Sequence, residues 1–139
     1  MLRIPYSTKV DIWSLGCIVA ELFTGEPLFP GNNEQELLEY IMEVKGIPHL
    51  SLIDLSRKKE HYFDQDGSPL LIEDPDLGIL RIPENRPLEV AVPSEDKQFL
   101  DFISKCLELD PRNRLTAREA LYHPFITGIV VSSTIKAYK

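Results

Sequence analysis

The side chains that could act as acids, bases or nucleophiles are scattered through this sequence of 139 residues. Its three histidines, His49, His61 and His123, lie far apart, and none belongs to a G-x-S-x-G or catalytic-cysteine pattern. Without such support we interpret each as a surface or helix-end residue. The sequence therefore predicts no nucleophile-and-base pair and no catalytic residue of its own.

The acidic motifs do not predict a metal or acid–base site either. The stretch DQDG, ending at Gly67, is similar to the start of a calcium loop, but the glycine comes too early and no glutamate closes a twelve-residue frame. A turn is the better interpretation. Asp74 and Asp76 flank Pro75, so we expect them to be solvated on a loop instead of facing each other as a catalytic pair.

Charge and glycine content exclude two further classes of function. The chain has 22 acidic and 15 basic residues, a net charge of −7, so it lacks the basic surface that nucleic acid requires. It also has no glycine-rich loop to hold a phosphate, so no cofactor-binding residue is predicted. The one basic cluster, residues 57 to 59, is expected on a solvated helix face, with contact to an acidic partner as the alternative.

Cysteine usage and hydropathy indicate the cellular setting. Cys17 and Cys106 have neither C-x-x-C spacing nor histidine partners, and both fall on apolar helix faces, which predicts reduced core thiols in an intracellular protein of the cytoplasm or nucleus. No stretch approaches about 20 uninterrupted apolar residues, so no membrane span is expected.

Helix caps and turn-forming residues separate the expected helices. The first covers residues 9 to 24, with Thr8 as N-cap and Gly25 beyond its end, and its nearly all-round apolar surface predicts burial on most sides. The second starts with a capping-box-like pair, Asn33 and Glu36, and ends at Gly46. Its core-facing residues are expected to be Leu37, Leu38, Ile41 and Met42, and its outward ones Glu34, Glu39 and Glu43.

The middle of the chain is expected to be irregular. Residues 49 to 93 are dense in proline, glycine, aspartate and asparagine, with room for one short helix and a hairpin at Asp66-Gly67. A further helix is expected from an N-cap at Ser94 to Asp110-Pro111, and a last one from the capping box of Thr116 and Glu119 to the H-P-F sequence. The tail after Thr127 has no assigned state, a frayed terminus being the plain interpretation.

Two separated motifs resemble protein kinases. Residues 6 to 31 read YSTKVDIWSLGCIVAELFTGEPLFPG and resemble the kinase subdomain centred on D-x-W-S-x-G. Residues 106 to 126 read CLELDPRNRLTAREALYHPFI and resemble the closing kinase motif. The helix and long insert between them look like the CMGC group of cyclin-dependent and MAP kinases. The sequences GEPLFPG, KKEHYFDQDGSP and FLDFISKCLELDP look most like the dual-specificity tyrosine-regulated (DYRK/Yak-type) family.

The resemblance implies a mainly α fold, the C-terminal part of the kinase large lobe with helices equivalent to F through I. Residues 1–126 would form this partial domain downstream of the activation segment, with residues 49–93 as the CMGC-type insert and 127–139 as a tail.

The resemblance also implies roles for four residues that support a kinase site. Asp11 would accept backbone N–H bonds from the catalytic loop, although it could instead cap its own helix together with Thr8. Arg114 would pair with the glutamate that ends the activation segment. Trp13 and Gly16 would likewise belong to the residues that support the kinase site structurally.

Two functions remain open on this basis. The sequence contains no glycine-rich loop, H-R-D or D-F-G motif, which phosphoryl transfer needs. We therefore expect a C-terminal portion of a serine/threonine or dual-specificity kinase, inactive alone, whose parent uses ATP and Mg²⁺ on protein substrates. The alternative is a non-catalytic helical module that binds a protein partner through the acidic helix at 34–43 or the insert. The exposed surface should separate the two functions. Alone, helix 9–24 would lose the catalytic loop and activation segment that should cover it, which would leave an apolar patch exposed.

Overall fold

The computed structural model describes residues 8–128, which form eight helices and no named strand. A single antiparallel bridge joins Phe63 and Pro69. The mainly α architecture expected from the sequence is confirmed. The helices are α1 (Lys9–Thr24), α2 (Glu34–Lys45), α3 (Leu50–Ile53), α4 (Lys59–Tyr62), α5 (Leu88–Ala91), α6 (Lys97–Cys106), α7 (Ala117–Leu121) and α8 (Pro124–Thr127).

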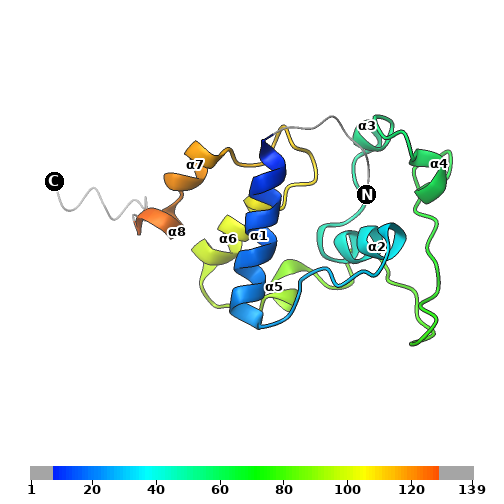
Figure 1. The fold of residues 1–139 in the computed structure, drawn as a ribbon, viewed down its shortest axis with the longest axis horizontal. Helices are drawn as coiled ribbons and strands as arrows, with labels where there is room; N and C mark the ends of the chain where they lie inside the picture. Colours follow the sequence, from blue (N-terminus) through cyan, green and yellow to red (C-terminus); the bar gives the residue numbers. More distant parts are fainter. Residues whose placement is uncertain (1–7, 129–139) are drawn as a thin grey trace.

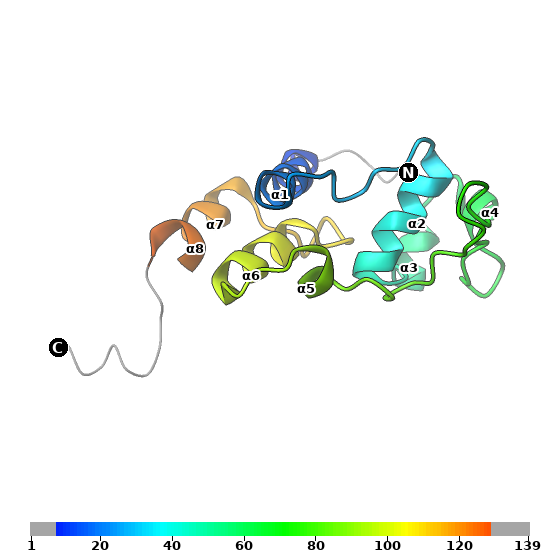
Figure 2. The ribbon, with the colours of Figure 1, turned by 90° about the horizontal axis from the view of Figure 1, so that it is seen from below.

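Helices α1 and α6 lie side by side at the centre of an elongated molecule (Figure 1). Helices α7 and α8 lie at one end and α2, α3 and α4 at the other, as Figure 2 also shows. The main apolar core forms between α1, α5 and α6, and a second cluster lies between α2 and the segment that carries α3 and α4. The two clusters are built around Ala20, Val92, Ile103 and Leu107, and around Leu38, Met42, Ile53 and Phe63.

Helix α1 has the bounds expected from the sequence, but one of its caps differs. Gly25 adopts the left-handed conformation (φ 80°) and donates its N–H to Glu21 O at 2.7 Å, as a glycine cap should. Thr8 occupies the N-cap position, yet its side chain makes no cap hydrogen bond because its backbone is already helical. The expected burial on most sides is also wrong within the described residues, since only the face of Ile12, Gly16 and Ala20 is buried.

Helix α2 starts as predicted and buries one residue that was expected outside. Asn33 Oδ1 accepts from Glu36 N at 2.9 Å, and the Glu36 carboxylate accepts from the backbone and side chain of Asn32 in place of the N-cap itself. Glu39, predicted to face solvent, is only 1% exposed. The reason is that the segment around Ile72 crosses this side of the helix and donates its N–H to Glu39.

The insert, residues 49–93, contains three short helices, α3, α4 and α5, instead of one. The DQDG stretch is a turn, as expected, because Asp64 Oδ1 accepts the N–H groups of Asp66 and Ser68. The prediction that Asp74 is solvated is wrong. Its carboxylate is largely buried and forms an ion pair with Arg81.

The basic cluster is also paired within the chain. Lys58 Nζ contacts Glu34 Oε2 at 2.5 Å and Lys59 Nζ contacts Asp54 Oδ1 at 2.6 Å. The acidic groups that meet Lys58 and Lys59 therefore come from the same chain.

The C-terminal helices differ from expectation mainly at their ends. The N-cap of α6 is Asp96, whose Oδ1 accepts from Gln98 N and Phe99 N. Ser94, two residues earlier, accepts from Asp96 N through its Oγ. Helix α6 also ends at Cys106, before the predicted Asp110-Pro111. The capping box of Thr116 and Glu119 is confirmed. The tail after Gly128 lies outside the described residues.

His123 is a helix-end residue, as interpreted, but it is buried. Its Nδ1 accepts from Phe125 N at 3.1 Å and caps α8. Its Nε2 lies 2.6 Å from Asp101 Oδ2, so α8 is tied to α6 through one imidazole.

Candidate functional site

One face of α1 carries a carboxylate followed by an apolar stripe. Asp11, Leu15, Ile18 and Leu22 recur at three- and four-residue spacing, so they lie on the same side of the helix. All four are exposed, Leu22 as much as 80%. The stripe of Leu15, Ile18 and Leu22 is therefore an uncovered surface of the kind that usually meets another segment.

The Asp11 carboxylate has no hydrogen-bond or ion-pair partner among residues 8–128. It does not cap its own helix with Thr8, so that alternative is absent from the described structure. Its place in the first turn of α1 favours a negative charge, because unpaired N–H groups gather there.

Arg114 fastens the loop after α6 to the start of α1. Its Nε donates to Glu108 O at 2.9 Å and its Nη1 donates to Lys9 O at 3.0 Å. Nη2 reaches Leu109 O at 3.4 Å. Burial lowers the pKa of the guanidinium, and the nearby Asp110 carboxylate opposes this shift. No carboxylate within the described range forms an ion pair with Arg114, so backbone carbonyls alone satisfy it.

Trp13 and Gly16 complete the contacts between α1 and the C-terminal half. The Arg114 guanidinium carbon lies 5.1 Å from the centre of the Trp13 ring, a cation–π distance, and Trp13 also stacks on Phe29 at 5.9 Å. Gly16 faces Cys106 so closely that a β-carbon there would stand 2.8 Å from Cys106 Cβ. The structure thus brings Trp13, Gly16 and Arg114 to one helix junction and leaves Asp11 outside it.

This arrangement can support a site but does not hold ATP or a metal by itself. Within residues 8–128, no group of three histidine, cysteine or acidic side chains could hold a metal ion. The sequence has no glycine-rich loop either, so ATP and Mg²⁺ do not fit the residues that the structure describes.

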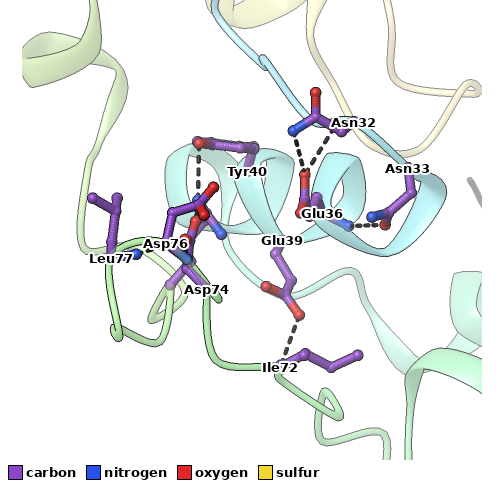
Figure 3. Close-up of polar contacts among 10 residues, drawn as sticks. Asn32, Asn33, Glu36, Glu39, Tyr40, Ile72, Asp74, Asp76 and Leu77 are labelled. Atoms are coloured by element: carbon purple, nitrogen blue, oxygen red, sulfur yellow. Dashed lines mark hydrogen bonds and ion pairs between the residues drawn. The ribbon is translucent and has the colours of Figure 1, made fainter.

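A second polar cluster, between α2 and the insert, was not found by sequence reasoning. Arg81 is buried, its guanidinium carbon lies 4.1 Å from the centre of the Tyr40 ring, and its Nη2 donates to Tyr40 Oη at 2.9 Å and to Asp74. Figure 3 shows Tyr40 and Asp74 on facing sides of this cluster. The Leu77 N–H, and after it Arg81, hold the pKa of Asp74 below its ordinary value. These partners are too distant along the chain for any spacing rule to join them.

No helix in the described part of the chain is long and apolar enough to cross a membrane.

The protein kinase domain family matches residues 2–126. Among curated proteins, the chain is 48% identical over 128 residues to the serine/threonine-protein kinase ppk5 of Schizosaccharomyces pombe and 46% identical over 128 residues to the DYRK-family kinase pom1 of the same organism. It is 44% identical over 126 residues to the dual specificity tyrosine-phosphorylation-regulated kinase 2 of Drosophila melanogaster.

These alignments cover 91 to 92% of this chain and 12 to 17% of the relatives, so the chain spans a small part of their length. They agree with the kinase motifs at both ends of the described structure. The chain belongs to the protein kinase domain family and, within it, to the DYRK-like branch of the CMGC group.

Proposed function

We propose that this chain is the helical floor of the large lobe of a DYRK-like kinase that transfers the γ-phosphate of ATP to serine, threonine or tyrosine in proteins. The observation that carries the proposal is the uncovered α1 face, Asp11 followed by Leu15, Ile18 and Leu22, in a chain of this family. Segments that carry the catalytic motifs would cover this face. Alone, the 139 residues are inactive.

Asp11 positions the catalytic loop in this proposal. An ionised carboxylate accepts stronger hydrogen bonds from backbone N–H groups than a neutral oxygen does, and Asp11 has both oxygens free for them within the described structure. Arg114 has a complementary role. Its contacts with Lys9 O and Trp13 hold the first turn of α1, and thereby Asp11, at a fixed position relative to the C-terminal half.

ATP and Mg²⁺ would be bound by the segments that supply the missing motifs, because the residues of this chain do not fit them. We also assign the protein to the cytoplasm or nucleus. The support is that Cys17 and Cys106 are free thiols and that burial raises the pKa of each to about 11, which keeps them unreactive in a reducing compartment.

A chimera tests the proposal. The segment of the ppk5 kinase that matches this chain would be replaced by these residues, and the transfer of labelled phosphate to a protein substrate would be measured for the chimera and for the 139-residue chain alone. We expect transfer by the chimera and none by the chain. In the chimera, Asp11→Asn should lower kcat by roughly ten- to hundredfold, because a displaced catalytic loop misaligns the reacting groups.

Asp66→Asn is the matched control, since Asp66 is an exposed aspartate in a remote turn. Phosphate transfer by the 139-residue chain alone would refute the proposal that the catalytic motifs lie in other segments. Equal losses in Asp11→Asn and Asp66→Asn, or no loss in either, would refute the role of Asp11.

A further inference from the structure

A cavity of about 210 Å³ lies between α2 and residues 72–81 of the insert. Its lining residues are Asn33, Gln35, Glu36, Glu39, Ile72, Glu73, Asp74, Pro75 and Arg81. The volume is below the roughly 300–1,000 Å³ of sites that enclose a whole small molecule. The cavity is therefore of a size for one inserted side chain.

The lining has four carboxylates against one guanidinium, and that guanidinium is already paired with Asp74. The decisive residue is Glu39, which is 1% exposed. Its Oε1 accepts from Gln35 Nε2 at 2.5 Å and from Ile72 N at 2.9 Å, both neutral donors. Figure 3 shows the bond with Ile72. No cation pairs with Glu39 among residues 8–128, and its Oε2 has no hydrogen-bond partner there.

A buried carboxylate without a positive partner is unfavourable, because neutral hydrogen bonds only partly replace its hydration. The cavity beside Glu39 is thus complementary to a cation. A metal ion is a poor candidate, since no cluster of three ligating side chains exists in the described structure. An organic cation, the ammonium of lysine or the guanidinium of arginine, fits both the charge and the volume.

The walls of the cavity are held in place before any ligand arrives. Arg81 is clamped between the Tyr40 ring and Asp74. Asp74 Oδ1 in turn accepts the N–H groups of Asp76 and Leu77, each at 2.9 Å. A fixed wall lowers the entropy cost of binding, so the cavity suits recognition better than a loose loop would.

Exposed aliphatic side chains are frequent in the segment of the insert that lines the cavity, and one of them, Ile72, is part of the lining. Leu70, Ile72 and Leu77 are 45%, 59% and 66% exposed, and Ile79, Leu80 and Ile82 are exposed in the same segment. Isolated exposed aliphatics are ordinary, but six within thirteen residues are a concentration that favours contact with another protein. A peptide could contact these aliphatic side chains as well as the charged cavity, whereas a free amine would use the charge alone.

We propose that this cavity is a docking site for a protein segment that inserts a lysine or arginine beside Glu39 and places aliphatic neighbours on Leu70, Ile72 and Leu77. The site lies in the insert and α2, away from the α1 face, so it does not depend on the proposed catalytic role.

The test uses short random peptides displayed on phage and selected on the 139-residue chain. We expect the enriched sequences to share a lysine or arginine next to leucine, isoleucine, valine or methionine. The most enriched peptide would then be synthesised with a fluorescent label, and its Kd measured by anisotropy on three proteins: the parent chain, Glu39→Gln and Glu60→Gln. Glutamine at position 39 keeps an oxygen for the Gln35 and Ile72 bonds, so the variant removes the charge with little change of shape.

Glu39→Gln should weaken binding roughly ten- to hundredfold, as expected for the loss of a charge-assisted hydrogen bond. Glu60→Gln, which removes an exposed glutamate on α4, should leave Kd within about twofold. Glu73→Gln is a second cavity variant, at a residue outside the hydrogen bonds of α2. It should also weaken binding, and it replaces Glu39→Gln in the test if that variant does not fold.

Three results would overturn the proposal. Enriched peptides without a basic residue would remove the charge argument. Equal Kd values for Glu39→Gln and Glu60→Gln would place the binding elsewhere. Displacement of the peptide by spermidine at concentrations below the peptide's own Kd would show that the cavity takes a small polyamine in preference to a protein segment.

Discussion

Replacing Gly16 by alanine should separate α1 from α6. The new β-carbon would stand 2.8 Å from Cys106 Cβ and 2.9 Å from Leu107 Cδ2. Neither neighbour can withdraw easily, because Cys106 and Leu107 are 0% exposed and packed in the core. The Cys106 atom is also bonded directly to the backbone of α6, so the helix itself would have to move.

The magnitude follows from two opposing contributions to the free energy of unfolding. Inserting a methyl group into a filled core costs about 1–3 kcal/mol. Alanine is a better helix former than glycine by about 1 kcal/mol, which offsets part of that cost. We expect a net loss of about 1 kcal/mol. Ser14→Ala is the matched control, since Ser14 lies exposed in the same helix and gains helix propensity without a clash.

Native-state amide hydrogen exchange is the suitable assay, because it reports local opening without requiring a two-state melt. The probes are the N–H groups of Ala20 in α1 and Ile103 in α6, both at residues with 0% exposure. In Gly16→Ala they should exchange about fivefold faster than in the parent chain. Ser14→Ala should leave the rates unchanged or lower them. Equal or stronger protection in Gly16→Ala would refute the reasoning, because the two helices would then have room for the methyl group.

Three other expectations concern separate parts of the molecule. The chain should bind a hydrophobic dye on the α1 face and unfold over a broad temperature range. Leu22→Glu should reduce the dye fluorescence without changing the helix content. A sharp calorimetric transition without dye binding would contradict the expectation of an uncovered apolar face. Arg114→Lys should cost about 2–4 kcal/mol by hydrogen exchange, since one ammonium cannot reach all three carbonyls. The N–H of Leu77 and the Arg81 guanidinium lower the pKa of Asp74 in the folded protein. The stability that the Asp74 carboxylate gives the insert is therefore complete at a pH above 3.8, the ordinary pKa of aspartate, and is lost as the pH falls through the lowered pKa of the folded state. The Leu77 amide shift in an NMR titration should follow that loss, and Asp74→Asn should abolish it.

The parts of the fold that could be predicted are those decided by neighbouring residues. Helix α1 begins and ends where its apolar run and Gly25 indicate, and the capping box of Thr116 and Glu119 forms as its spacing requires. Even so, local competition can mislead. Ser94 and Asp96 are both good N-caps, and in the structure Asp96 caps α6 while the Ser94 hydroxyl accepts from Asp96 N.

The parts that could not be predicted depend on contacts between distant segments. Glu39 has the spacing of a solvent-facing residue, and only the return of the chain at Ile72 buries it. Likewise, nothing near Asp74 in a proline-rich loop indicates that Arg81 will fold back across Tyr40. Of the four site residues singled out by the kinase resemblance, three meet at the junction of α1 with α6 and the following loop, but their roles in a kinase remain predictions.

Asp11 and Glu39, two of the carboxylates that form no ion pair within residues 8–128, carry different weight as indications of a missing partner. Asp11 is exposed in the first turn of a helix, where water and the helix dipole stabilise its charge, so its lack of a partner costs little. Glu39 is only 1% exposed and lines a small cavity, so water hydrates its charge less fully than that of Asp11. The physical argument for a ligand is therefore stronger at Glu39, while the argument at Asp11 rests on the family. The Glu39 site can be tested with this chain alone, whereas the role of Asp11 needs the catalytic segments joined to it.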